Sequence, residues 1–512
     1  MLAIILLIMN LIRFKEIFRP YIELDRRSLA LMRVLSASIV LYDLVARLSN
    51  LSAHYGDGSV MPPEALLGAG SGEAWLPFVP HLMQAVLHVP LAVMTVALVC
   101  VSFVLVGYRT RLNTIISWVL LLMIQSMNPF VLSGADTMTR LIFFFGMFLP
   151  WGDYFSIDRV RREGEGAPPR VASVWTFALL LQISFIYFFA ALIKSTGVDW
   201  QNGSAVYYAL SMDIATPLGT ALLRVDWILP ALTHVVRLFQ LAVPFLLFFP
   251  IAPQAIRTAT MVLLMLMHVS FAFLLHVEMF SLISIALLTC LLPSTFWRFL
   301  RDRLKERFGD VTLYYDGDCG FCKKSSYFIQ TFFVPHAKVE IAQHQSDIYE
   351  DMRMSRPVKT ASAISATVFV LAISVWNIGT IINFQKPAIF TEVMKAAGIA
   401  QSWHMFSPVP RNLNFMYVAD GITEVGVPVR VFEMPHPYVD ERWRKYLQSI
   451  AANDNRYYRR HFLSYLCTEW NSSHERDERL ASVDLLFVYV ATLSDRQTSP
   501  KRILKHASAS CD

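Results

Sequence analysis

Long apolar stretches recur along the first three hundred residues and are separated by short polar segments. The clearest covers residues 171–193, "VASVWTFALLLQISFIYFFAALI", and carries no charge. A helix needs about 20 mainly apolar residues to cross a bilayer, where no water satisfies the backbone. The pattern therefore predicts about eight or nine membrane-spanning helices. They fall at residues 28–48, 88–107, 112–127, 140–151, 171–193, 228–250, 258–276, 280–293 and 361–382.

Basic residues alternate along the chain with neutral or acidic loops. The loop at residues 50–80 has no lysine or arginine, whereas residues 13–27, 109–111, 159–170 and 298–307 hold basic clusters. Cytoplasmic loops are enriched in Lys and Arg. We therefore expect a cell-membrane protein with a cytoplasmic amino terminus, and a periplasmic or extracellular tail after residue 382.

Composition agrees with a chain that lies mostly in lipid. It is 55% hydrophobic and 16% charged, whereas soluble domains have about a quarter charged residues. The basic residues form short clusters between apolar runs, so we expect the bilayer as partner and no nucleic acid. The predicted parts are an interfacial segment at 1–19, a transmembrane domain at 20–296, a cytoplasmic insert at 310–355, a last span at 361–382 and a tail at 383–512.

The insert and the tail show different periodicities from the apolar stretches. In the insert, "VTLYY" and "KVEIAQ" predict strands on either side of a helix that begins near Gly320. In the tail, alternation in "FMYVADG" and "VPVRVFEM" predicts a β-hairpin, and "RWRKYLQSIAAN" and "RRHFLSYLCTEW" predict helices. The fold class is therefore a mainly α, multi-pass membrane bundle with a small α/β insert and a mixed α/β tail.

Ionisable residues at membrane depth are costly and are candidate functional groups. Lys194 ends the uncharged fifth stretch, and Tyr187 lies seven residues earlier on the same helix face. Asp136 and Arg140 are four residues apart, which suits an ion pair. The predicted topology places Lys194 and Asp136 toward the outer face.

Two histidines add to this set. His234 and Arg237 lie one turn apart near the start of another stretch, and His268 falls within "MLMHVSF". One interpretation is a polar pocket that opens outward. The structural alternatives are that Lys194 extends its amine to the outer headgroups, that His268 is a hydrogen-bonded core residue, and that Asp136 with Arg140 only joins two helices.

The stretch "IYFFAALIKSTGVDWQNGSAVYYAL" resembles the HTTM family, the membrane domain related to vitamin K-dependent γ-carboxylase. That family has a helix rich in Tyr, Phe and Ala that ends in Lys and is followed by Asp-Trp and Gly. "QSWHMFSPVP" is similar to a Trp-x-Met-Phe-x-Pro stretch of the same family. The matching positions of the first stretch are Tyr187, Phe188, Ala190, Lys194, Asp199, Trp200 and Gly203.

The resemblance implies a chemistry for Lys194. In the γ-carboxylases the corresponding lysine is the base that activates vitamin K hydroquinone, and a glutamate side chain then loses a proton and gains CO2. A desolvated lysine suits that role because burial disfavours its charged form. A quinone- or hydroquinone-like lipid cofactor and a secreted peptide or protein substrate would follow, with Asp199 and Trp200 beside the base.

The insert resembles a second family. Of six cysteines, only Cys319 and Cys322 have the Cys-x-x-Cys spacing of a reactive pair. With Asp316 and Asp318 they form "DGDCGFC", which is similar to the thioredoxin-like DCC family and implies thiol–disulfide oxidoreductase activity. The available length suggests a truncated thioredoxin-like half-domain. A zinc site using His336 and His344 is the other interpretation, although their spacing exceeds that of usual fingers.

Three functions remain open at this point. The first is a carboxylase-like membrane enzyme with Lys194 as base. The second is a thiol–disulfide oxidoreductase using Cys319 and Cys322. The third is a non-catalytic membrane protein that acts in maturation, immunity or scaffolding of a secreted peptide.

Overall fold

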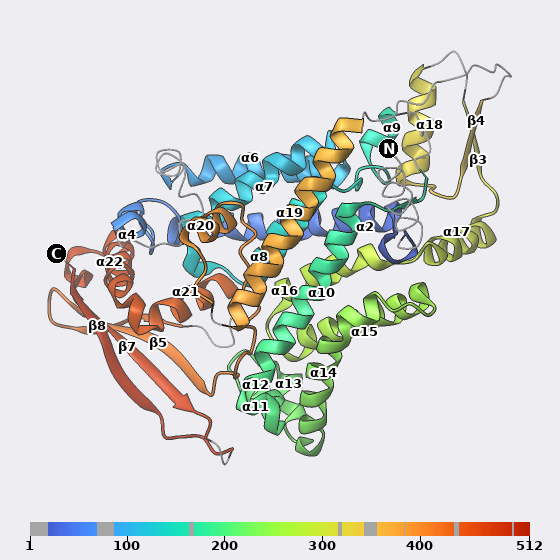
Figure 1. Cartoon of the computed structure of the whole chain (residues 1–512). Coiled ribbons are helices and arrows are strands. Elements are labelled where there is room, and N and C mark those ends of the chain that lie inside the picture. The colour runs from blue at the N-terminus through green and yellow to red at the C-terminus, as the bar shows by residue number, and fades with distance from the viewer. Residues whose placement is uncertain are drawn as a thin grey trace.

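The computed structural model describes residues 19–68, 87–162, 168–315, 320–341, 356–382, 384–434, 440–493 and 496–511. A helical bundle occupies the centre, and the insert and the tail lie at opposite ends of it (Figure 1). The bundle helices are α2 (Arg26–Ser49), α6 (Pro90–Val106), α7 (Thr110–Met127), α8 (Gly134–Gly146), α10 (Val174–Ser195), α14 (Leu229–Leu247), α15 (Pro253–Leu274), α16 (Glu278–Leu288) and α19 (Arg356–Ile381).

Five helices in the described part of the chain are long and apolar enough to cross a membrane. They are Arg26–Ser49, Val174–Ser195, Asp226–Leu247, Pro253–Leu274 and Ile364–Ile381. A bent pair, Met279–Leu291 with Ser294–Phe308, would make a sixth. The sequence predicted eight or nine spans, and the additional ones stay a prediction.

Helix α8 differs from its prediction at residues 140–151. It begins after Ser133, whose side chain forms a capping box with Asp136, and it ends at Gly146. Such a box satisfies free backbone donors at a helix start. Asp136 therefore lies in the first turn of α8.

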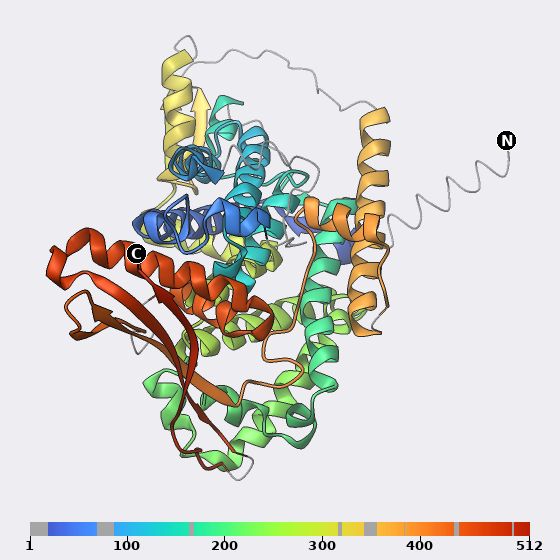
Figure 2. The same cartoon turned by 90° about the vertical axis from the view of Figure 1, so that its left-hand side faces the viewer.

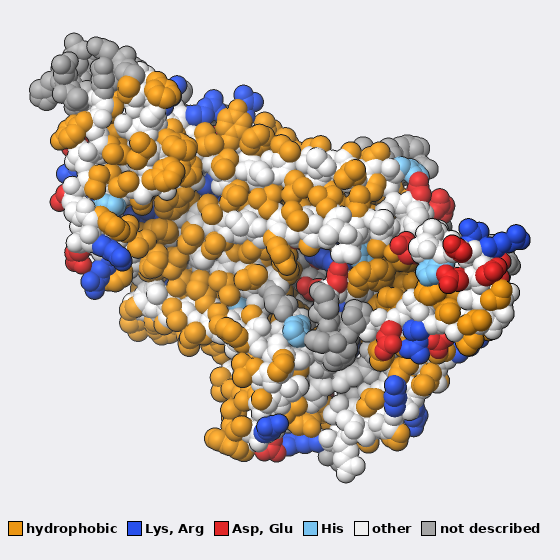
Figure 3. Space-filling model, turned by 180° about the vertical axis from the view of Figure 1, so that it is seen from behind, with side chains coloured by type: hydrophobic (Ala, Val, Ile, Leu, Met, Phe, Trp, Pro, Cys, Tyr) orange, Lys and Arg blue, Asp and Glu red, His pale blue; other side chains and the backbone are white. Residues whose placement is uncertain are grey.

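The surface of the bundle is apolar. Figure 3 shows hydrophobic side chains across its middle, with charged side chains gathered mainly toward the edges. Helices α14 and α15 contribute large exposed residues, among them Leu238, Leu266 and Phe273, each more than half exposed. An apolar surface this continuous is typical of a protein that contacts lipid or a partner.

The basic clusters of separate loops meet at one end of the bundle. Arg26 forms an ion pair with Asp153, and the Arg109 amide donates to Asp158. Arg170 donates to Ser294 at the start of α17 (Ser294–Phe308). The basic clusters, which alternate with neutral or acidic loops along the sequence, therefore lie at the same end of the bundle. This arrangement is the one expected of a multi-pass topology.

The insert also lies at this end. Strands β3 (Thr312–Tyr315) and β4 (Lys338–Ile341) pair in parallel around α18 (Gly320–Phe332), which confirms the predicted strand–helix–strand order. Helix α18 packs against α9 (Ile157–Arg161) of the bundle.

Among the described residues, the tail contains a four-stranded antiparallel sheet and three α-helices, the first of which is α20 (Ala388–Ala396). The strand order is β6 (Pro428–Glu433), β5 (Leu413–Thr423), β7 (Leu480–Ala491) and β8 (Arg502–Ser510). The predicted hairpin and both helices, α21 (Glu441–Ala451) and α22 (Arg456–Ser473), are confirmed. Helix α22 covers one face of the sheet (Figure 2). A Cys467–Cys511 disulfide, which the sequence analysis did not predict, joins α22 to the chain after β8.

Candidate functional site

Helix α10 carries Lys194 into the interior of the protein. A capping box between Ser173 and Thr176 fixes its start, and most of its apolar residues are buried. Lys194 lies in the last turn and is only 5% exposed. Its Nζ lies 5.3 Å from the ring centroid of Trp200, in the short helix α11 (Val198–Asn202). This distance is suitable for a cation–π contact.

The beginning of the tail closes over this end of α10. We refer to residues 401–408 as the closing segment. The indole N–H of Trp200 donates to the Phe406 carbonyl over 2.8 Å. A Cβ at Gly197 would lie 1.6 Å from the Pro408 carbonyl oxygen, so only glycine fits there. The Lys194 end of the bundle and the tail therefore lie on the same side of the protein.

Glutamine and tryptophan side chains fix the closing segment. Gln401 and Gln182 of α10 exchange two amide hydrogen bonds, of 2.9 and 3.0 Å. Trp403 donates to the Gln401 side chain, and Trp376 of α19 donates to its carbonyl. The "QSWHMFSPVP" stretch thus contributes the wall of the Lys194 site.

Among the described residues, no carboxylate forms an ion pair with Lys194. The nearest acidic residue in sequence, Asp199, is half-buried and accepts a hydrogen bond from Ser204. His234 is half-buried, and its Nε2 lies 3.3 Å from where a Cβ on Gly203 would stand, so it borders α11. Arg237 is also half-buried, one turn further along α14.

Tyr187 and His268 form a separate polar pair in the bundle. The Tyr187 hydroxyl and His268 Nε2 are 2.9 Å apart, and both side chains are buried. Seven residues of helix place Tyr187 about 10 Å along the axis from Lys194. The pair joins α10 to α15 rather than contacting the lysine, in agreement with a hydrogen-bonded core histidine.

Asp136 belongs to a buried ionic cluster, which we define as Asp43, Arg47, Asp136 and Arg442. Arg47 and Arg442 each contact both carboxylates, over 2.5 to 2.8 Å. Burial acts to raise the pKa of Asp136, but the charges of Arg442 and Arg47 outweigh it and hold that pKa well below its usual range. The cluster has two positive and two negative charges and joins α2, α8 and α21.

The sequence predicted a different partner for Asp136. Four-residue spacing favoured Arg140, but Arg140 donates to Gln125 and to the Gly398 carbonyl. The ionic cluster needs Arg442, which is 306 residues from Asp136. One signal for it was present in the sequence, because Asp43 and Arg47 are ionisable residues four apart within a predicted span.

Cys322, the described member of the dithiol pair, lies with α18 at the opposite end of the molecule. Asp316, Asp318 and Cys319 are outside the described residues, whereas Cys322 is in the first turn of α18 and is disulfide-bonded. No group of three His, Cys, Asp or Glu residues that could hold a metal occurs in the described part of the chain. His344 of the zinc interpretation is outside that part, and His336 is buried.

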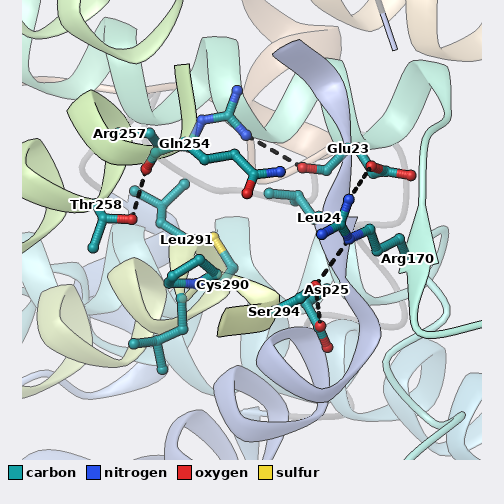
Figure 4. A pocket seen from close by; sticks show the side chains of 12 residues that line it. Glu23, Leu24, Asp25, Arg170, Gln254, Arg257, Thr258, Cys290, Leu291 and Ser294 are labelled. Carbon is teal, nitrogen blue, oxygen red and sulfur yellow. Dashed lines mark hydrogen bonds and ion pairs between the residues drawn. The ribbon is translucent and has the colours of Figure 1, made fainter. Parts of the chain in front are cut away.

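A small cavity lies at the same end, and several of its polar lining residues bond to one another (Figure 4). Arg170 bonds Glu23 and Ser294, and Arg257 donates to the Glu23 carbonyl. The cavity has about 30 Å³, enough for one or two water molecules. It is therefore too small for a substrate.

Comparison with known families matches residues 21–297 to the HTTM domain. That range is more than half of the chain and includes Lys194, Asp199 and Trp200. The chain belongs to the HTTM family. Together with its apolar helices, this makes it a membrane protein of that family. No curated protein and no solved structure matches the chain.

Proposed function

We propose that this HTTM protein is a membrane enzyme in which Lys194 removes a proton from a quinol-like, lipid-soluble reductant, as the first step of a carboxylase-like reaction. The observation that carries the proposal is a buried amine with no ion-pair partner among the described residues, which lies over the ring of Trp200, itself hydrogen-bonded to the closing segment. A buried amine without a carboxylate favours the neutral form, which is the form that accepts a proton.

Trp200 has a complementary role in this proposal. The neutral amine of Lys194 takes the hydroxyl proton of the quinol and becomes an ammonium ion. The face of the Trp200 ring stabilises that cation at 5.3 Å. Asp199, His234, Arg237, Tyr187 and His268 remain candidates for the walls of the substrate pocket, and Asp136 is better explained as part of the ionic cluster.

The proposed orientation places the base on the outer side of a cell membrane. Two observations support it. The basic clusters share the end opposite the tail, and the tail has a Cys467–Cys511 disulfide, which is typical of oxidising compartments. A secreted peptide or protein would then reach the Lys194 end from the tail side, while the insert faces the cytoplasm.

The insert gives a second candidate function, thiol–disulfide exchange. It is favoured by the disulfide-bonded Cys322 in the first turn of α18, because reduction of that disulfide would leave a thiol at a helix N-terminus, where the dipole stabilises a thiolate. A non-catalytic role in maturation, immunity or scaffolding is the third. Cys319→Ser separates the second from the first, because it should leave a Lys194-dependent activity nearly intact.

The test of the lead proposal uses full-length protein in nanodiscs with a reduced quinone and oxygen. Lys194→Arg keeps charge and reach but cannot deprotonate, so quinol-dependent oxygen uptake should fall about 100- to 10,000-fold. Lys386→Arg is the matched control, because Lys386 also lies over a tryptophan, 5.0 Å from Trp376. Full activity in Lys194→Arg would contradict the base role. Co-purified quinone should be sought by mass spectrometry.

A further inference from the structure

A larger cavity lies at the end of the bundle opposite Lys194, between α17, α18 and the start of α2. It has about 250 Å³, equivalent to roughly eight water molecules. Its walls come from four segments of the chain, at residue 27 and at residues 154–159, 297–304 and 330–336, and α9, α17 and α18 all lie at this end (Figure 1). We define it as the α17 cavity.

The side chains that line the α17 cavity are basic, apolar or polar without a negative charge. Among the described residues they include Arg27, Arg159 and Arg301 and no carboxylate. Arg27 and Arg301 pair with Asp25 and Asp302, which do not line the cavity. The Arg159 guanidinium stacks over Tyr154 at 4.4 Å and donates a long hydrogen bond, of 3.5 Å, to the Asp153 carbonyl. The cavity therefore favours an anion.

Two polar side chains in the wall lack partners. Thr331 and His336 are 7% and 9% exposed. The Thr331 hydroxyl and both ring nitrogens of His336 have no hydrogen-bond partner in the part of the chain described. Buried polar atoms are nearly always satisfied by protein, water or a ligand. These unsatisfied hydrogen-bonding atoms belong to the same cavity wall as the arginines.

Helix α17, which lines this cavity, has the composition of a helix at a membrane surface. It turns by 90° from the apolar helix that precedes it. Phe296, Phe299 and Phe308 are 38%, 59% and 61% exposed, while Arg298, Arg303 and Arg307 lie on the same helix. A helix with exposed aromatic residues and many basic ones is typical of the membrane interface.

From these observations we infer that the α17 cavity binds the phosphate-bearing headgroup of an anionic phospholipid. Arg27 and Arg159 would contact the phosphate, and Thr331 would donate a hydrogen bond to it. The acyl chains would lie outside, beside the apolar face of α17, because the cavity holds only a headgroup. Basic pockets beside membrane helices are suited to such lipids. The same phosphate chemistry occurs in soluble phosphate esters, which the test must distinguish.

The test measures lipid binding to the full-length protein in detergent by native mass spectrometry. Phosphatidylglycerol should bind more tightly than phosphatidylcholine, and Arg27→Gln and Arg159→Gln should each weaken its binding about fivefold. Arg303→Gln is the matched control. It also removes one positive charge at this end of the molecule, but Arg303, in α17, does not line the cavity. It should change the affinity less than twofold.

Two further measurements test the contact of the Thr331 hydroxyl and the source of the phosphate. Thr331→Val retains shape and charge, so it should still weaken phosphatidylglycerol binding if the hydroxyl contacts the phosphate. Wild-type affinity in both Arg159→Gln and Thr331→Val would overturn the site, as would an equal loss in Arg303→Gln. Glycerol 3-phosphate should not displace the lipid at equal concentration. Displacement would show a soluble phosphate ester as the ligand and overturn the lipid assignment.

Discussion

Two sets of buried basic side chains lie on the tail side of this protein, and their surroundings differ. Arg47 and Arg442 each contact Asp43 and Asp136, so the ionic cluster is neutral overall. Lys194 is equally buried, but its recorded contact is with the ring of Trp200. A compensated charge holds helices together, whereas a buried amine without a counter-charge favours its neutral form and is a candidate for chemistry. Both sets depend on the tail, through α21 for the first and the closing segment for the second.

The largest effect on stability is expected in the ionic cluster. Arg442→Met leaves two carboxylates with one guanidinium, and breaking a buried pair costs about 3–5 kcal/mol. Equilibrium unfolding in mixed micelles should show this loss, with early proteolytic release of the tail. Arg430→Met is the matched control, because Arg430 also bridges two carboxylates but is 51% exposed. Exposed pairs contribute about 0–1 kcal/mol, and equal losses in both variants would contradict the comparison.

Acid should weaken the same interface through His54. Burial lowers the pKa of His54 from 6.5 to about 4, and its ring packs 4.6 Å from that of Trp443 in α21. As the pH falls, His54 is therefore protonated in the unfolded chain at a higher pH than in the folded protein. The contribution of neutral His54 to the free energy of unfolding is fully present above pH 6.5 and is lost as the pH drops toward 4. The loss from this group is on the order of 3 kcal/mol.

His54→Phe should remove that part of the acid sensitivity. The measurement is the unfolding free energy of wild type and variant at pH 7 and pH 4.5, compared as differences. His88→Phe is the control, because His88 is 48% exposed and pairs with Asp57, which is 68% exposed. The same pH dependence in wild type and His54→Phe would contradict the assignment to His54.

The smallest expected stability change has the opposite sign. Lys194→Met removes an amine that has no ion-pair partner among the described residues, so it should stabilise the fold by about 1–3 kcal/mol while abolishing activity. Thermal unfolding together with the quinol assay measures both effects. A destabilised Lys194→Met would show that the lysine is a structural contact like Arg442, and the difference between the two sets would disappear.

The sequence alone determined the elements whose signals are local. Apolar stretches predicted the bundle helices, alternation predicted the β5–β6 hairpin, and the run ending in Lys194 indicated the HTTM family, which the match over residues 21–297 confirms. Hydrophobic periodicity depends on neighbouring residues only, so it can be read without a fold. The number of spans and the roles of the candidate residues could not be settled in this way.

Only the tertiary structure decided which distant groups meet. Asp136 joined Arg442 rather than the predicted Arg140, the closing segment bonded to Trp200 beside Lys194, and Cys467 paired with Cys511. The strand order β6-β5-β7-β8 and the α17 cavity likewise arise from segments far apart in the chain. The physical reason is that a buried charge or donor needs a partner close in space, and spacing along one helix identifies only the partners within a turn.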